Sequence, residues 1–161
     1  MLCYSVKMLM PIRKRTYANG FTLIELLLVV AIITILAAIV IVALNTQRNL
    51  ASSNNAQRWS DVNTTLNAIH QYSIDNSGIL PSTIPTGAGG VEICRTDATS
   101  CAGLIDLSVL TFEERYVLQL PIDPTSASAN GTGYFVYKTA YDRVFVTAPF
   151  AQLGMTIQVG R

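Results

Sequence analysis

Residues 20–44 read GFTLIELLLVVAIITILAAIVIVAL, and this stretch decides the fold. From Phe21 to Leu44 only Thr22, Glu25 and Thr34 are polar, so a helix formed by these 24 residues is apolar on nearly every side. At about 1.5 Å per residue the helix is roughly 36 Å long, enough to cross a hydrocarbon core of about 30 Å. The stretch therefore predicts a membrane-spanning helix over residues 21–44.

The segment before this stretch is basic. Four of the eleven basic residues lie before Gly20, and no acidic residue does. A secretory signal has its apolar part before the cleavage site, whereas here the basic part and Gly20 come first. A cut after Gly20 would remove these charges, so we expect residues 1–20 to be a cleaved leader. The same mature chain results from a start at Met1, Met8 or Met10.

The charge distribution predicts how the chain is oriented. Basic residues on the N-terminal flank keep that end in the cytoplasm and place the head, from Asn45 onward, outside. After Gly20 the chain has seven basic and ten acidic residues, a net charge of −3, with no Lys/Arg cluster. Such a head is a poor phosphate binder, so we do not expect nucleic-acid binding.

Glu25 is the one charged residue in the apolar stretch. A carboxylate at the centre of a spanning helix costs about 2.5–3.5 kcal/mol on insertion scales, and less near the interface. One interpretation leaves Glu25 hydrated at the level of the lipid headgroups. The other gives it a partner, the α-amine that cleavage would create on Phe21 of a neighbouring copy in a helical assembly. Such a pair would reward correct axial register, because a lone charge in apolar surroundings is costly.

The run from Gly20 to Leu27, followed by Val29–Ile33 and Leu36–Ile39, resembles the N-terminus of type IV pilins and pseudopilins. The resemblance implies that a prepilin peptidase cuts between Gly20 and Phe21 and N-methylates Phe21. It also implies that Glu25 guides subunit addition. The mature protein would wait in the cytoplasmic membrane until an assembly ATPase and an inner-membrane platform add it to a fibre of identical copies.

Two structural functions follow from the resemblance. The first is a subunit of a type IV pilus or pilus-like filament, extracellular after assembly. The alternative is a pseudopilin of a type II secretion system, whose periplasmic fibre works as a piston; calcium dependence would favour this. A membrane-anchored adhesin or DNA-uptake pilin is a further alternative.

The chain beyond the apolar stretch predicts a continuation of the same helix. No Gly or Pro occurs from Phe21 to Ser77, and the spacing predicts one helix of about 50–55 residues. Its second half, residues 45–77, is amphipathic. The apolar stripe that faces the core is spaced by three and four residues: Trp59, Val62, Leu66 and Ile69.

Residues 78–106 are rich in Gly, Pro, Ser and Thr and predict a loop. Cys94 and Cys101 lie close together in this polar loop, which favours a disulfide formed in an oxidising compartment. A metal site is disfavoured because the only histidine, His70, is distant in sequence and the spacing is not C-x-x-C.

The head spans residues 45–161, and the last third of it predicts a small sheet. Thr111-x-x-Glu114 resembles a capping box and predicts a short helix within 107–120. β-Branched and aromatic residues predict about three antiparallel strands within 133–160. These strands are Gly133–Thr139, Arg143–Ala148 and Met155–Val159. The class is therefore α+β, and the resemblance implies a pilin-like fold with the long helix packed on this sheet.

Pro121-x-Asp123-Pro124 and the following Gly-x-Gly-Tyr are similar to the head of type II secretion pseudopilins, some of which bind calcium in this loop. Asp123 and Asp142 are weak calcium candidates, because two carboxylates fall short of six to eight oxygen ligands. The alternative is that Asp123 shapes a turn between prolines. We expect no other cofactor.

The sequence contains no catalytic constellation. G-x-S-x-G, Walker-type, H-E-x-x-H and C-x-x-C motifs are all missing, and His70 falls in the middle of the predicted helix. We therefore expect a structural protein with no small-molecule substrate and no enzyme activity.

Overall fold

The computed structural model describes residues 20–43 and 45–161. The chain divides between Leu44 and Asn45 into two compact units, which are described in turn. Most of the predicted leader, residues 1–19, lies outside the described residues.

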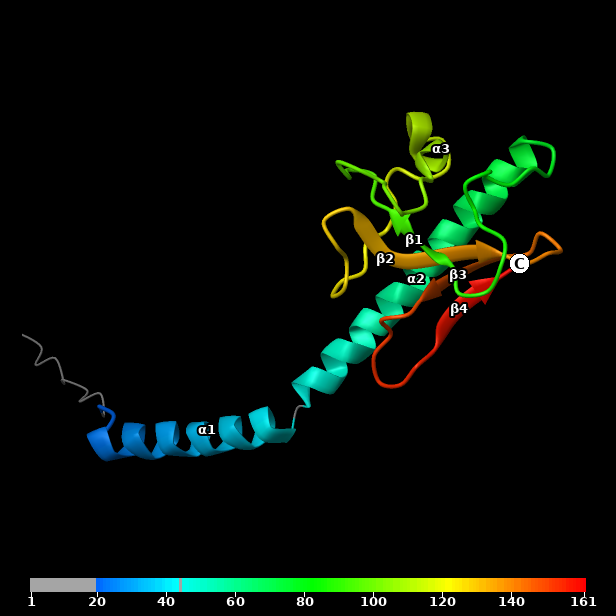
Figure 1. The fold of residues 1–161 in the computed structure, drawn as a ribbon. Helices are drawn as coiled ribbons and strands as arrows, with labels where there is room; N and C mark the ends of the chain where they lie inside the picture. Colours follow the sequence, from blue (N-terminus) through cyan, green and yellow to red (C-terminus); the bar gives the residue numbers. More distant parts are fainter. Residues whose placement is uncertain (1–19, 44) are drawn as a thin grey trace, which may run out of the picture. The chain divides into compact units, whose positions relative to one another are not determined.

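The first unit is the helix α1, Leu23–Ala43 (Figure 1). Thr22 begins it, because its side-chain Oγ1 accepts a hydrogen bond from the Glu25 amide and its carbonyl accepts one from the Leu26 amide. The Thr34 hydroxyl donates to the Ala31 carbonyl one turn earlier. The side-chain oxygens of both threonines thus form hydrogen bonds with the backbone of α1 itself.

The second unit opens with the helix α2, Thr46–Asp75. The helical region is thus two helices of 21 and 30 residues, whereas the sequence predicted one continuous helix. Asn45 explains the difference: its backbone is not helical, and its side chain accepts a hydrogen bond from the Arg48 amide. Asparagine is among the best residues for this N-cap position, so the sequence contains a helix start that the lack of Gly and Pro concealed.

Four strands form one antiparallel sheet in the order β1-β2-β3-β4 within the described residues. The α+β class and the antiparallel sheet are confirmed. Strands β2–β4 correspond to the three predicted strands, and β1 lies in the predicted loop 78–106. The bounds are Val91–Cys94 for β1, Gly131–Lys138 for β2, Val144–Ala148 for β3 and Ile157–Gly160 for β4.

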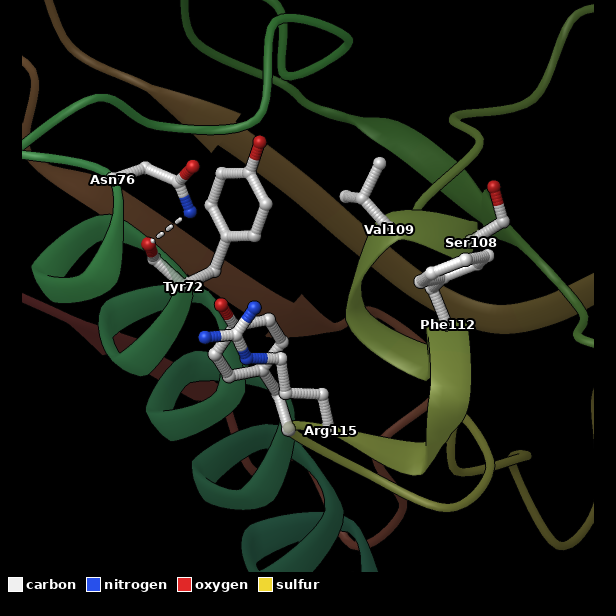
Figure 2. A pocket seen from close by; sticks show the side chains of 7 residues that line it. Tyr72, Asn76, Ser108, Val109, Phe112 and Arg115 are labelled. Carbon is white, nitrogen blue, oxygen red and sulfur yellow. Dashed lines mark hydrogen bonds between the residues drawn. The ribbon is translucent and has the colours of Figure 1, made fainter.

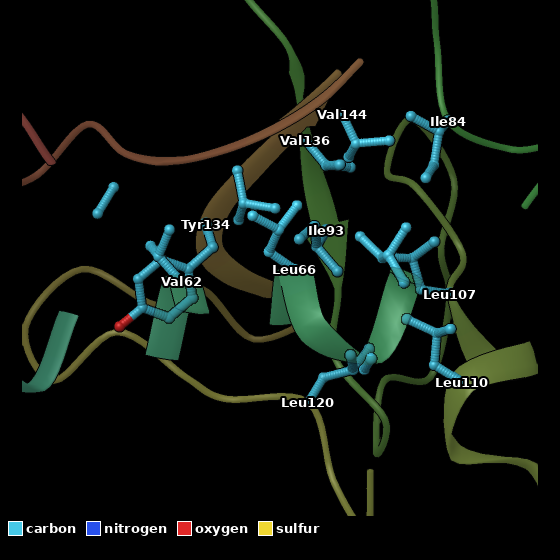
Figure 3. Packing of buried hydrophobic residues seen from close by; sticks show 14 of the residues in the cluster. Val62, Leu66, Ile84, Ile93, Leu107, Leu110, Leu120, Tyr134, Val136 and Val144 are labelled. Atoms are coloured by element: carbon cyan, nitrogen blue, oxygen red, sulfur yellow. The ribbon is translucent and has the colours of Figure 1, made fainter. Parts of the chain in front are cut away.

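The core lies between α2 and the sheet, where α2 contacts β3 and β4 (Figure 3). Val62, Leu66 and Ile69 are buried, as predicted. Trp59 was wrongly placed on this face, since its side chain is 37% exposed. The buried face continues through Arg58 instead, four residues before Val62, and Arg58 is 0% exposed.

The segment before β2 differs from its prediction. The helix α3, Ser108–Thr111, lies within the predicted range 107–120 but is shorter than predicted and ends at the first residue of the capping-box pattern, and a 3₁₀ turn, η1, spans Phe112–Glu114. Asp106 accepts a hydrogen bond from the Ser108 amide, and the N-cap residue of α3 is Leu107, four residues before the predicted capping-box threonine. The Thr111 hydroxyl donates to the Ser108 carbonyl, and the extended backbone of Phe112 ends the helix.

Candidate functional site

The apolar side chains of α1 are exposed along the whole helix. Every large apolar side chain from Phe21 to Val42 is at least 45% exposed. Leu23–Val42 has a mean hydropathy of 3.1, and its length and composition suffice to cross a membrane. A helix that is apolar all round needs lipid or other apolar helices around it.

Glu25 lies in the first turn of α1 and is its only charged residue. With Phe21, Leu26 and Val29 it lines an open hollow of about 320 Å³ on one side of the helix. An acid in the first turn is stabilised by the helix dipole, which is positive at that end. Phe21 and Glu25 are one turn apart on this surface.

The bond between Gly20 and Phe21 lies before the first helical residue, Leu23. Both residues are exposed, and a Cβ built on Gly20 meets no atom within 4 Å.

Comparison with known families identifies this region. Residues 15–41 match the family model for the prokaryotic N-terminal methylation motif, which covers the basic residue Arg15, the Gly20–Phe21 bond and most of α1. The chain carries the N-terminal motif of the type IV pilin and pseudopilin family. No curated protein and no solved structure matches the chain.

The head of this pilin-like chain contains a disulfide between Cys94 and Cys101, with a Cα–Cα distance of 5.5 Å. Cys94 ends β1, and its amide donates to the Ile105 carbonyl, so both sides of the loop are held. The disulfide thus closes a loop at the margin of the sheet.

A buried ion pair joins α2 to the segment that precedes β2 in the pilin-like head. Arg58 Nε is 2.6 Å from Asp123 Oδ2, and Nη2 is 3.0 Å from Oδ1. Arg58 also donates to Asn55 Oδ1 at 3.0 Å and to Thr125 Oγ1 at 2.6 Å. Asp123 Oδ1 further accepts from the backbone amides of Thr125 and Ser126. Asp123 therefore shapes the turn between the prolines and also neutralises a buried guanidinium.

Sequence reasoning missed this pair. Its signal was present: Arg58 falls at core spacing from Val62, and a cation on the buried face of an amphipathic helix needs an acidic partner. Burial disfavours the charge on Asp123, but the hydrogen bonds from Arg58 and from two amides outweigh it, so the pKa of Asp123 lies below its ordinary value.

A second buried contact lies one turn along α2. The Tyr134 hydroxyl donates to Asp61 Oδ2 at 2.6 Å. Burial raises the pKa of Asp61, and this hydrogen bond offsets only part of the rise. Burial and the nearby carboxylate also raise the pKa of Tyr134.

The two calcium candidates lie in different settings. Asp123 is fully buried against Arg58, whereas the exposed Asp142 pairs with Lys138 Nζ at 2.8 Å. Each carboxylate thus has a cationic side chain as its partner. Residues 20–43 and 45–161 contain no group of three His, Cys, Asp or Glu side chains arranged to hold a metal ion.

His70 is half-buried on α2. Its Nε2 is buried and has no hydrogen-bond partner in the described part of the chain. Burial, and then the charge of Arg161, lower its pKa. Its surroundings therefore favour neutral imidazole, with no acid or nucleophile bonded to it.

Proposed function

We propose that this chain is the structural subunit of a type IV pilus or pilus-like filament. It is held in the cytoplasmic membrane by α1 before assembly, with the N-terminus in the cytoplasm and the head outside. The single observation that carries the proposal is the methylation motif over residues 15–41, coincident with a helix that is apolar on all sides and has one acid near its start.

The exposed apolar surface of α1 supports a function in which the helix exchanges lipid neighbours for copies of itself. Apolar side chains exposed from Phe21 to Val42 are stable in lipid, and they are equally stable against copies of the same helix. Since lipid and helix are both apolar, packing and charge pairing decide the exchange between them. The filament is then a homopolymer with α1 helices in its centre and heads outside.

Processing prepares this exchange. A prepilin peptidase cuts between Gly20 and Phe21, and the accessible position of this bond before α1 supports that step. The cut removes the basic leader and leaves a new amine on Phe21, which is then methylated. That amine is a cation placed at the end of α1 where an incoming copy presents Glu25.

Glu25 provides the register of assembly in this proposal. In the membrane its carboxylate lies within the first turn of α1, near the headgroups. In the filament it pairs with the Phe21 amine of a neighbouring copy. Removal of either partner leaves an unpaired charge among apolar helices, which is strongly unfavourable.

The test compares filament yield with membrane accumulation for Glu25→Ala and Glu25→Val. We expect both variants to accumulate in the membrane and the filaments to be lost. Thr34→Val is the matched control, because its hydroxyl bonds within the helix and no partner copy is needed to satisfy it. Normal filaments from the Glu25 variants would contradict this role for Glu25.

Pseudopilins share the same motif, so the location of the fibre separates the two systems. A fibre outside the cell that contains this chain as its main component fits the pilus. A fibre confined to the periplasm, together with a requirement for calcium, fits the type II secretion pseudopilin.

A further inference from the structure

A pocket of about 320 Å³ opens between the C-terminal end of α2 and the segment that contains α3 (Figure 2). Tyr72 and Asn76 form its α2 side, and Val109 and Phe112 stand opposite (Figure 2). The ring centroids of Tyr72 and Tyr116 are 5.7 Å apart in an edge-to-face arrangement, which makes the floor aromatic. The pocket therefore offers an apolar, aromatic cavity at the surface of the head.

The turn between the two lining residues Phe112 and Arg115 has an unusual backbone conformation. Glu113 and Glu114 both have left-handed backbones, with φ of 53° and 55°. A left-handed backbone is strained for a residue other than glycine. Phe112, which lines the pocket, is 68% exposed. Strained backbone conformations cluster at binding sites.

Two acidic residues, Glu113 and Glu114, lie in the chain between Phe112 and Arg115, which both line the pocket. Glu113 and Glu114 follow Phe112 directly, and neither has an ion-pair partner among the described residues. Arg115 lies over the Tyr116 ring, and its charge is already paired with Asp75 at 3.3 Å. A ligand for this pocket should therefore bring an apolar or aromatic group with a cation beside it.

The same head carries such a group on the loop between β2 and β3. Tyr141 is 90% exposed, the highest exposure among the large apolar and aromatic side chains of the described residues. The loop is well defined: the Asp142 amide donates to the Thr139 carbonyl, and Thr139 pairs with Arg143. A turn followed by the left-handed Asp142 is a common three-residue hairpin connection. Tyr141 therefore lies in a loop whose backbone is held by hydrogen bonds.

Arg143 supplies the cation beside this tyrosine. Its guanidinium lies over the Phe145 ring at 5.9 Å, and it forms no ion pair within residues 20–43 and 45–161. The projecting loop thus joins an exposed aromatic ring to an unpaired positive charge. The pocket offers an aromatic cavity, and the unpaired Glu113 and Glu114 adjoin its lining residue Phe112 in the chain.

We propose that Tyr141 of one copy of this chain inserts into the pocket between Tyr72 and Phe112 of a neighbouring copy, with Arg143 placed at Glu113 and Glu114. The inference rests on the proposed filament, since it requires copies side by side. Within the head, α3 and the β2–β3 loop lie on different sides of the C-terminal end of α2 (Figure 1). A projection and its complementary pocket at different places on one chain form a head-to-tail contact, which repeats along a helical polymer.

Cysteine cross-linking in intact filaments tests the contact. One strain expresses two forms of the full chain, one with Ala140→Cys beside the tyrosine and one with Ser108→Cys at the pocket, so Tyr141 and Phe112 stay intact. A short bis-maleimide should join the two forms in filaments and leave them single in the detergent-extracted membrane pool. The matched control pairs Ser108→Cys with Ala129→Cys, an exposed alanine in the loop before β2.

A cross-link several-fold stronger for the first pair than for the control supports the contact. Filaments that form normally but give equal cross-linking overturn it, and the proposed filament function then stands. Absence of filaments from the unmodified chain would instead contradict the proposed function. The two failures are therefore distinguishable.

Charge reversal is the second arm. Arg143→Glu should reduce the yield of sheared filaments several-fold, and the addition of Glu113→Lys and Glu114→Lys should restore it. Failure of the combined reversal to restore the yield, with all variants present in the membrane, counts against the pairing of these charges.

Discussion

Arg58 and Asp123 form a two-bonded ion pair whose side chains are both 0% exposed, with Nε–Oδ2 at 2.6 Å and Nη2–Oδ1 at 3.0 Å. The pair ties α2 to the turn that leads into β2. Every other polar contact of Arg58, to Asn55 and Thr125, reinforces this position. The packing of α2 against this turn therefore depends on an ion pair, where the sequence predicted apolar contacts.

Replacement of either partner should destabilise the head strongly. Arg58→Leu leaves a buried carboxylate without its cation, and breaking a buried pair in this way costs about 3–5 kcal/mol. The measurement is the free energy of unfolding of the full chain in nonionic detergent, followed by the fluorescence of Trp59, the only tryptophan. Asp123→Asn should have a similar effect, and the double variant should lose less than the sum of the two.

Arg95→Leu is the matched control for this prediction. Arg95 also binds an aspartate, Asp97, through Nε and Nη2, but its partner is 66% exposed. Exposed pairs contribute about 0–1 kcal/mol. Equal losses for Arg58→Leu and Arg95→Leu would contradict a special role for the buried pair.

Acid should weaken the head through the same pair. The pKa of Asp123 is below its ordinary value in the folded state, so its stabilising contribution is fully present above the unfolded pKa of about 3.9. The contribution is lost as the pH falls through the folded pKa, where Asp123 gains a proton. Urea unfolding between pH 6 and pH 2.5 should therefore show a fall in stability below about pH 4 that is smaller in Asp123→Asn. If the stability of the unmodified chain and of Asp123→Asn falls equally with pH, protonation of Asp123 is not the cause.

Gly133→Ala should destabilise the head by more than backbone strain alone. Gly133 has φ +81°, and an added Cβ would lie 2.7 Å from the Cβ of Asp123. Gly103→Ala is the control, since Gly103 has φ +76° with nothing within 4 Å. We expect about 1–2 kcal/mol of strain in both, and about 1–3 kcal/mol more in Gly133→Ala from the overlap. Equal unfolding free energies for the two variants would show that the turn at Asp123 yields to the extra methyl.

Reduction of the disulfide should cost the head about 2–3 kcal/mol, the chain-entropy value for a loop as short as that from Cys94 to Cys101. The check is urea unfolding of the chain with and without a reductant, with Cys94→Ala/Cys101→Ala as the variant that does not respond to it. Hydrogen exchange of the Cys94 amide, which bonds to Ile105, should accelerate on reduction. An unchanged unfolding midpoint after complete reduction would contradict the prediction.

The sequence predicted the features that depend on local patterns. The apolar run that forms α1 and the spacing of Val62, Leu66 and Ile69 required no knowledge of distant residues. The hairpin of β2 and β3 was equally local, since a short link joins two β-branched runs. These signals are strong because they repeat over many residues.

The features that the sequence did not predict depend on single residues or on contacts between residues far apart in the chain. Asn45 starts a new helix through one side-chain hydrogen bond. The four-residue β1 is defined by pairing with β2, about forty positions later, and its own composition gives little warning. The Arg58–Asp123 pair joins positions 65 residues apart, and no local pattern specifies such a partner.

The most direct test of the central claim is the mass of the subunit in purified filaments. Intact and N-terminal fragment spectra should show a chain that begins at a methylated Phe21, lacks residues 1–20 and keeps the Cys94–Cys101 disulfide. A chain recovered from its native cell with residues 1–20 still attached, and unable to polymerise, would contradict the account.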